Sequence, residues 1–287
     1  MTATATPALT WLYVPGDRPD RIHKALATTA DAVIIDLEDA VAPERKAEAR
    51  AALADLLSSL GNEPRPEIWV RVQSGVADDL KVAVHPAVAG VCLPKAESVD
   101  SVGAAADQIS ALEEGQVRAA PTAVMLLIET ARGVLRCEQL ASASDRVAVL
   151  QIGEQDLRAD LGLPPPSEGD PEPEPIRAAR ATVVLVSRVA GLVAPVGPVS
   201  MVLKDDERLE AETVLLRGSG FGSRAAIHPD QLAPIRRGMT PTAAEIAWAR
   251  EVVAADNGGV AVVGGKMIDA PVVAQARRII DVSERAG

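Results

Sequence analysis

The chain has 287 residues, 48% of them apolar, and a formal net charge of −11 at pH 7. This length and apolar content allow a sizeable core, arranged as one large domain or two. An acidic chain without basic runs is poorly suited to bind nucleic acid or an anionic membrane, so neither partner is expected.

Neither a membrane anchor nor an export signal is expected. Charged residues and prolines interrupt every apolar run before it reaches the ~20 residues of a transmembrane helix. The first ten residues contain no basic segment and no long apolar stretch. Cys92 and Cys137 lie in apolar or helical contexts without metal-ligand spacing. These two cysteines therefore indicate reduced thiols and a cytoplasmic location.

The first half of the chain contains five runs that are typical of buried strands, most of them followed by a helical pattern. The runs cover residues 9–15, 32–36, 67–73, 90–95 and 123–128. After the first run, Asp17 is expected as a helix N-cap, with Pro19 in the first turn. In the helix after the second run, Lys46 and Arg50 share one face at i and i+4.

The second half continues the same alternation of strand and helix. A sixth strand is predicted at residues 146–153, a weak seventh at 193–199 and an eighth at 224–229. Between the sixth and seventh lies Pro164 to Pro175 (PPPSEGDPEPEP), which is too rich in proline for a helix or a central strand. We interpret it as a surface loop and not as a domain linker, because a helical pattern over residues 176–193 resumes the alternation.

Eight strand-like runs spread over ~235 residues predict an α/β fold of the (β/α)8 TIM-barrel type, which typically has ~250 residues. A doubly wound open sheet is the alternative, but its phosphate-binding fingerprints are missing. Gly218 to Gly222 precede a strand instead of following one. After Gly265 and Lys266, Met267 replaces the Ser or Thr that a phosphate-binding loop requires.

The pattern changes near Thr240, so we expect a barrel domain over residues 1–238 and a C-terminal segment over 239–287. The segment is predicted to contain a helix over 241–255, a short β-like stretch over 260–268 and a last helix that opens at Asp269. A closed barrel does not need these residues. We therefore expect them to form a lid or an oligomer contact.

Charged residues follow the predicted strands where a barrel would have its mouth. The fifth run stops abruptly at Glu129, and the sixth leads into Asp156. Because the carboxyl ends of the strands converge, these two carboxylates can share one Mg²⁺ and leave about four positions for water and substrate. Zinc is not expected, since no His or Cys belongs to the group. The other charged residues expected at this mouth are Asp36, Glu38, Asp39, Arg71 and Lys95.

Structural roles remain open for the same residues. Glu129 and Asp156 could each serve a helix cap, and Arg71 could form a structural ion pair with Asp36 or Glu38. If Arg71 is free, it would instead hold a substrate carboxylate or a developing enolate oxygen. Structural or solvent-exposed roles are also expected for the remaining candidates, His23, Lys46, Arg50, His85 and His228.

Eight short segments occur in order along almost the whole chain. They are VPGDRP (14–19), AVIIDLEDAV (32–41), RVQ (71–73), LPKAE (93–97), IETARG (128–133), GEQDL (153–157), IHPDQ (227–231) and GKMIDAP (265–271). Together they resemble the citrate lyase beta-chain and malyl-CoA lyase family, within the HpcH/HpaI aldolase group. The resemblance implies a (β/α)8 barrel that binds Mg²⁺ through Glu129 and Asp156, which also contact the substrate.

The resemblance also implies how a coenzyme A thioester is used. Arg71 would be the electrostatic partner of the substrate carboxylate or of the thioester enolate. Glu38 is a further catalytic candidate because of its place at the predicted mouth, independently of the resemblance. Arg18 and Lys24 would meet the phosphates of coenzyme A. The C-terminal segment would cap the site of a neighbouring subunit in a homotrimer or a dimer of trimers, with Asp269 as the acid or base.

The implied reaction is the cleavage of a 3-hydroxy-carboxyacyl thioester, carried by coenzyme A or an acyl-carrier protein, into an acetyl-type thioester and a 2-oxo acid, or the reverse condensation. A thioesterase on the same scaffold and a subunit active only within a lyase complex are the alternatives. The chain departs from the family pattern at Gln73, at Gln155, in the run from Ala194 to Pro198 and in the PPPSEGDPEPEP loop. These departures concern the identity of the substrate more than the metal pair.

Overall fold

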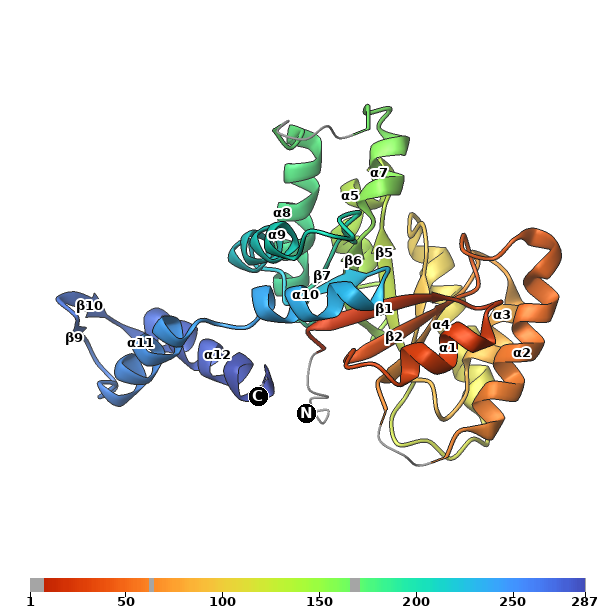
Figure 1. Ribbon diagram of the computed structural model, residues 1–287, viewed down its shortest axis with the longest axis horizontal. Helices are drawn as coiled ribbons and strands as arrows, with labels where there is room; N and C mark the ends of the chain where they lie inside the picture. Colours follow the sequence, from red (N-terminus) through yellow and green to blue (C-terminus); the bar gives the residue numbers. More distant parts are fainter. Residues whose placement is uncertain (1–7, 62–64, 166–170, 287) are drawn as a thin grey trace.

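Eight parallel strands close into a barrel (Figure 1), which confirms the predicted (β/α)8 fold. The computed structural model describes residues 8–61, 65–165 and 171–286 of the chain. Each strand pairs with the next one along the chain, and β8 returns to β1. The strands are β1 (Thr10–Pro15), β2 (Ala32–Asp36), β3 (Glu67–Arg71), β4 (Gly90–Leu93), β5 (Ala123–Ile128), β6 (Val147–Ile152), β7 (Val196–Gly197) and β8 (Ser223–Ala226).

Helices connect successive strands and cover the outside of the barrel. They are α1 (Pro19–Leu26), α2 (Lys46–Ser59), α3 (Ala77–Ala83), α4 (Val99–Glu113), α5 (Ala131–Leu135), α6 (Cys137–Ala141), α7 (Glu154–Asp160), α8 (Glu174–Val189), α9 (Asp206–Gly218) and α10 (Leu232–Met239). Two short 3-10 turns, η1 (Pro43–Arg45) and η2 (Pro229–Gln231), precede α2 and α10. Within the described residues, no helix is both long enough and apolar enough to span a membrane.

Alternate residues of each strand face either the helices or the barrel interior. In β2, Val33 and Ile35 belong to the apolar layer between strands and helices, whereas Ala32 and Ile34 belong to a second cluster inside the barrel. The interior cluster also contains Trp11, Trp69, Cys92, Met125, Leu127, Val149, Val196 and Ala225. The lower barrel is therefore packed with side chains, and space for a ligand remains at its ends.

The same alternation carries polar side chains to the mouth of the barrel. Five strands each present a polar side chain on the inward face, two residues after a member of the interior cluster and within two residues of the strand's carboxyl end. These inward-facing residues are Tyr13, Asp36, Arg71, Glu129 and Gln151. A packed apolar floor thus lies directly beneath a charged mouth.

The C-terminal segment extends away from the barrel, in blue at the left of Figure 1. It consists of α11 (Ala243–Ala254), the antiparallel hairpin of β9 (Ala261–Val263) and β10 (Lys266–Ile268), and α12 (Ala270–Ala286). It has an apolar cluster of its own, made of Ala249, Val252, Ile268, Val273 and Ala276. Near its end, Val282 of α12 packs against the core of the barrel.

Three predictions of local structure were wrong. The seventh strand is limited to Val196–Gly197, because Pro195 and Pro198 flank it and cannot donate ladder hydrogen bonds. Helix α8 begins at Glu174, inside the predicted loop, since proline is tolerated in the first turn of a helix. Residues 166–170 of that loop lie outside the described residues. Asp17 does not cap α1 and instead pairs with Arg45 at 2.6 Å.

Candidate functional site

Arg71 is held at the mouth by two carboxylates. Its Nε and Nη2 donate to Oδ1 and Oδ2 of Asp36 at 2.8 and 2.6 Å, and its Nη1 lies 3.0 Å from Oε2 of Glu38. Burial lowers the pKa of the Arg71 guanidinium, but the hydrogen bonds and charge of Asp36 more than offset this, so that the pKa lies above its usual value. The predicted ion pair therefore exists with both partners. It fixes the guanidinium while leaving it beside the mouth.

Tyr13 packs against Arg71 and is itself held by Gln151. The guanidinium carbon of Arg71 lies 5.3 Å from the centre of the Tyr13 ring, within the range of a cation–π contact. The Tyr13 hydroxyl donates to Oε1 of Gln151 at 2.8 Å. Burial raises the pKa of Tyr13 well above its usual value, so the phenol stays protonated and serves as a donor. Neither residue was predicted as part of the site, although their place in the period-2 pattern of β1 and β6 was a usable signal.

Glu129 follows β5 and is almost completely buried, with 2% of its surface exposed. Its Oε1 accepts the backbone N–H of Lys95 at 2.7 Å. The pKa of the Glu129 carboxyl is raised to about 7, chiefly by burial and also by the negative charges of Asp156 and Glu38, against the opposing effect of the Lys95 N–H. Glu129 is not a helix cap, because Thr130 caps α5 through the N–H of Gly133. Its second oxygen, Oε2, accepts no hydrogen bond from the described residues and is available to a ligand.

The turn from β6 into α7 brings Asp156 toward Glu129. Gly153 occupies this turn, and a Cβ atom at that position would lie 2.4 Å from Oε2 of Glu129. Only glycine leaves room for the carboxylate at this distance. Asp156 stands in the first turn of α7 with 39% of its side chain exposed, and it makes no capping hydrogen bond within the described part of the chain.

The side chain of Lys95 lies among the carboxylates of Glu38, Asp39 and Asp156 at the mouth. Its Nζ lies 3.3 Å from Oε1 of Glu38, 3.9 Å from Oδ2 of Asp39 and 4.0 Å from Oδ1 of Asp156. Burial raises the pKa of Glu38 above its usual value, against the opposing effect of Arg71 and Lys95. Among the described residues, five carboxylates at this mouth thus surround two cationic side chains, Lys95 and Arg71.

The donor set suits a hard divalent cation. Oε2 of Glu129 accepts no hydrogen bond from the described residues, and the carboxylate of Asp156 is partly exposed to solvent. Both can therefore bind a cation, and the excess negative charge at the mouth would attract one. Within the described residues, no three His, Cys, Asp or Glu side chains are grouped closely enough to hold a metal by themselves. A cation here would take its other ligands from water or substrate, as Mg²⁺ commonly does.

Two groups of charged residues hold the loops around the mouth. Nζ of Lys46 donates to the backbone oxygens of Leu37 (2.7 Å) and Glu38, so Lys46 is not part of a solvated face as one alternative had it. Arg50 pairs with the buried Asp79 at 3.0 Å, and Asp79 also accepts hydrogen bonds from Gln73. On the other side of the mouth, a network of alternating charge joins α7, α8 and the segment between them through Glu154, Arg158, Glu172 and Arg180.

Three predicted site residues lie outside this cluster. Arg18 pairs with Asp20 at 3.2 Å, and Lys24 is exposed on α1. Asp269 lies at the start of α12, where its Oδ1 accepts the N–H of Val272 at 3.4 Å. The C-terminal segment that carries it projects away from the barrel of its own chain (Figure 1). His228, by contrast, has the structural role that was expected, as the N-cap of η2.

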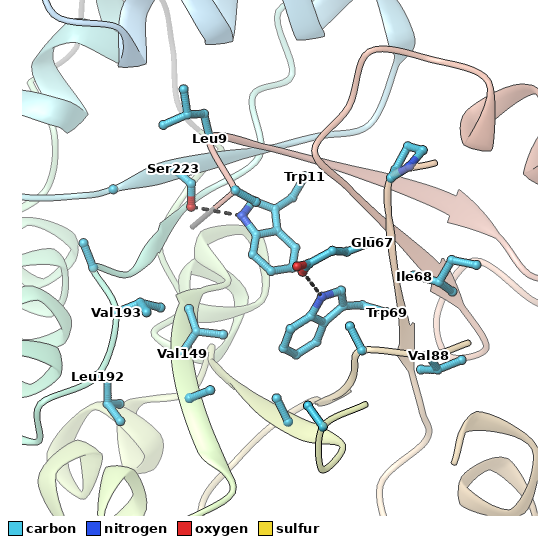
Figure 2. Close-up of a pocket in the computed structure, with 18 of the residues that line it drawn as sticks. Leu9, Trp11, Glu67, Ile68, Trp69, Val88, Val149, Leu192, Val193 and Ser223 are labelled. Atoms are coloured by element: carbon cyan, nitrogen blue, oxygen red, sulfur yellow. Dashed lines mark hydrogen bonds between the residues drawn. The ribbon is translucent and has the colours of Figure 1, made fainter. Parts of the chain in front are cut away.

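A cavity of about 980 Å³ lies at the opposite end of the barrel (Figure 2). It is lined by residues from the amino-terminal ends of the strands, including Trp11, Trp69 and Val149. The indole N–H groups of Trp11 and Trp69 donate to Ser223 and Glu67, at 3.0 and 3.2 Å. TIM barrels carry their chemistry at the carboxyl ends of the strands. The carboxylate-rich mouth is therefore the candidate active site.

Comparison with known proteins agrees with this architecture. The profile of the HpcH/HpaI aldolase/citrate lyase family matches residues 9–229. A citrate lyase subunit beta-like protein of Mycobacterium tuberculosis is 34% identical over 96% of this chain and 95% of its own length. An L-malyl-CoA/beta-methylmalyl-CoA lyase of Cereibacter sphaeroides is 28% identical over 98% of this chain and 96% of its own length.

A solved structure shares the fold over the whole length. It is that of CitE from Mycobacterium tuberculosis in complex with magnesium, acetoacetate and coenzyme A. It aligns with a TM-score of 0.80 at 33% identity and covers 98% of this chain and 100% of that chain. The chain therefore belongs to the HpcH/HpaI aldolase/citrate lyase family.

Proposed function

We propose that this chain is a Mg²⁺-dependent carbon–carbon lyase for 3-hydroxy-carboxyacyl thioesters of the malyl-, citramalyl- or citryl-CoA type. The products would be an acetyl-CoA-type thioester and a 2-oxo acid, and the reverse direction would be a Claisen-type condensation. The observation that carries the proposal is the pair of carboxylates, Glu129 and Asp156, beside the fixed guanidinium of Arg71. The lyase names of the relatives and the magnesium, acetoacetate and coenzyme A bound to the structural neighbour support the substrate class.

Mg²⁺ held by Glu129 and Asp156 would polarise the carboxylate and hydroxyl oxygens of the substrate. Arg71 supplies a positive charge that Asp36 keeps in one orientation, where negative charge develops on the thioester oxygen. Glu38 is the candidate base for the substrate hydroxyl, because its raised pKa brings it closer to neutral pH. Loss of that proton and cleavage of the carbon–carbon bond leave a 2-oxo acid and an enolate, which needs a proton on carbon.

The proton donor in this proposal is Asp269 of a neighbouring subunit. Asp269 lies on a segment that projects from its own barrel, and that segment has its own apolar cluster. We therefore propose residues 1–238 as the catalytic barrel and 239–287 as a lid and oligomerisation segment, in a homotrimer or a dimer of trimers. Closure of the lid over a neighbour's mouth would exclude water and protect the enolate.

The coenzyme A arm would leave the mouth along α1. Arg18 is the N-cap residue of α1 and Lys24 lies in its last turn, and both are at least partly exposed to solvent. Their positive charge would attract the phosphates against the acidic charge of the whole chain. A second space of about 320 Å³, lined in part by Gln73 and Lys95, opens beside the mouth between β3 and α4 and is available to the acyl part.

Product analysis with Mg²⁺ and either malyl-CoA or citramalyl-CoA tests the proposal. A lyase releases glyoxylate or pyruvate, detected as its phenylhydrazone, without any free thiol. A thioesterase releases malate or citramalate and one equivalent of free thiol. The Glu129→Gln variant should lose both Mg²⁺ binding and release of the 2-oxo acid, whereas Glu138→Gln, on the exposed face of α6, should retain both. Full activity of Glu129→Gln would refute the assignment.

A further inference from the structure

Lys95 adopts a backbone conformation that is unusual for its residue type. Its φ is +48°, and it is the one non-glycine residue with positive φ in the part of the chain that the structure describes. The left-handed conformation is costly for a residue with a Cβ atom and nearly free for glycine. In this conformation, the Lys95 N–H donates to Oε1 of Glu129 at 2.7 Å. Glycine could donate the same bond with less strain, so the bond alone does not explain a lysine here.

The side chain of Lys95 reaches into the densest group of negative charge at the mouth. Its ammonium lies 3.3 Å from Glu38, 3.9 Å from Asp39 and 4.0 Å from Asp156. Glu38 and Asp39 come from the loop after β2, whereas Asp156 comes from α7 on the other side of the mouth. Arg71 is already committed to Asp36 and Glu38, so Lys95 is the cation that lies close to Asp156 in this group.

We propose that Lys95 is a positioning residue whose ammonium acts as a built-in counter-cation for Glu38, Asp39 and Asp156 and competes with the divalent cation for the mouth. In the absence of substrate, the ammonium offsets the repulsion between these carboxylates and weakens cation binding. An anionic substrate brings its own negative charge, which relieves this competition. Lys95 thereby couples the binding of Mg²⁺ to the binding of the oxyacid. This inference rests on the proposed metal site of Glu129 and Asp156.

Calorimetric titration of the apoprotein with MgCl₂, without substrate, measures the competition directly. Lys95→Met removes the charge but still places a residue with a Cβ atom in the left-handed conformation. This variant should bind Mg²⁺ about three- to tenfold more tightly than the wild type. Lys95→Gly removes the charge and also relaxes the backbone, and it should show the same gain. Lys95→Arg keeps a positive charge and should stay within about twofold of the wild type. Lys81→Met, which removes an exposed lysine paired with Asp78, should leave the affinity unchanged.

Repeating the titrations with saturating pyruvate tests the coupling. Pyruvate should tighten Mg²⁺ binding by the wild type more than it tightens binding by Lys95→Met. Thermal melting adds a second readout, because Lys95→Met should melt lower than the wild type in EDTA and gain more from added Mg²⁺. This larger gain is not expected from a lysine that only stabilises the fold.

The outcomes separate this inference from the proposed function. If the wild type binds Mg²⁺ but Lys95→Met and Lys95→Gly bind it equally well or more weakly, the role of Lys95 is refuted and the metal site stands. If Lys95→Met melts at a lower temperature but its Mg²⁺ affinity does not change, the role of Lys95 is likewise refuted and the metal site stands. If the folded wild type binds no Mg²⁺ with or without pyruvate, both the metal site and the role of Lys95 are refuted.

Discussion

Arg71 and Asp36 lie directly opposite each other on neighbouring strands, in register across β2 and β3, and form a bidentate ion pair with distances of 2.8 and 2.6 Å. The same carboxylate accepts the backbone N–H groups of Glu38 and Ala40, at 2.8 and 3.1 Å. Asp36 therefore orients the guanidinium and also shapes the loop that carries Glu38. A single buried side chain thus positions two of the proposed catalytic groups.

We expect Asp36→Asn to reduce both stability and activity. Removal of the bidentate partner leaves the buried Arg71 charge compensated by Glu38 alone, so the free energy of unfolding should fall by up to roughly 3–5 kcal/mol, as measured in urea. A guanidinium that is no longer held in place should lower kcat on the order of 10²-fold, with a smaller effect on KM. Asp78→Asn, which breaks the exposed pair with Lys81, is the matched control and should change neither quantity measurably. Wild-type stability of Asp36→Asn would contradict this reading of the pair.

Much of this arrangement follows from local sequence pattern. The eight apolar runs were enough to predict the barrel, because strands buried on both faces are nearly continuous in apolar residues. Glu129 was identifiable as the charge that ends such a run. Tyr13 and Gln151 were missed because a polar residue inside an apolar strand is visible only when the inward and outward faces are separated.

Contacts between segments that lie far apart in the chain could not be predicted from the sequence pattern. Lys46 was assigned to a helix face, but its reach to the carbonyls of Leu37 and Glu38 depends on how α2 folds back over the loop after β2. The left-handed backbone of Lys95 is set by the position of Glu129, 34 residues later in the chain. In the proposed function, the position of Asp269 at the barrel mouth of a neighbouring subunit depends on how the chains assemble. The hydrophobic pattern of a single chain does not contain that information.

The raised pKa of Glu129 predicts a pH dependence for metal binding. Since the carboxyl has a pKa of about 7, protons should compete with Mg²⁺, and the affinity should fall about tenfold per pH unit below 7. Above about pH 8 it should level off. Calorimetric titrations between pH 5.5 and 8.5 measure this, with Glu129→Gln as the control without binding. A flat profile across pH 7 would contradict the raised pKa.

The same pKa makes the metal-free protein less stable at higher pH. Because the folded-state pKa of about 7 exceeds the ordinary value of 4.5, the neutral carboxyl favours folding below about pH 4.5, and this contribution is lost as the pH rises through 7. The loss corresponds to roughly 3 kcal/mol. Urea unfolding in EDTA should show about 2 kcal/mol of this loss between pH 5.5 and 8 in the wild type, and none of it in Glu129→Gln. Mg²⁺ should restore stability at the higher pH.

Gly153→Ala should damage the metal site by steric contact alone. The added Cβ would lie 2.4 Å from Oε2 and 2.6 Å from Cβ of Glu129, so the carboxylate has to move. We expect Mg²⁺ affinity to fall at least about tenfold, the equivalent of one displaced ligand bond. Gly103→Ala is the matched control, because a Cβ there meets nothing within 4 Å. Gly103 lies inside α4, so that variant should be more stable by roughly 0.5–1 kcal/mol and bind Mg²⁺ normally.

Arg18 and Lys24 should contribute to binding of the coenzyme A phosphates and not to the chemical step. The double variant Arg18→Ala/Lys24→Ala should raise KM for malyl-CoA about tenfold with kcat unchanged, and it should reduce the salt dependence of KM. The corresponding pantetheine thioester, which lacks the nucleotide phosphates, should react equally well with both proteins. Arg177→Ala, an exposed arginine on α8, serves as the control for loss of a positive charge. Equal KM values for malyl-CoA would remove both residues from the binding site.

Complementation between two inactive variants tests whether Asp269 works in a neighbour's mouth. Asp269→Asn should retain Mg²⁺ binding and lose most activity, whereas Glu129→Gln should lose both. When the two are unfolded together, mixed in equal amounts and refolded, about one quarter of the sites should combine an intact mouth with an intact Asp269 from the adjacent subunit. Activity should therefore recover to about that fraction of the wild type. Mixtures that stay inactive despite forming mixed oligomers, verified by two affinity tags, would place Asp269 in its own chain's site or outside the chemistry altogether.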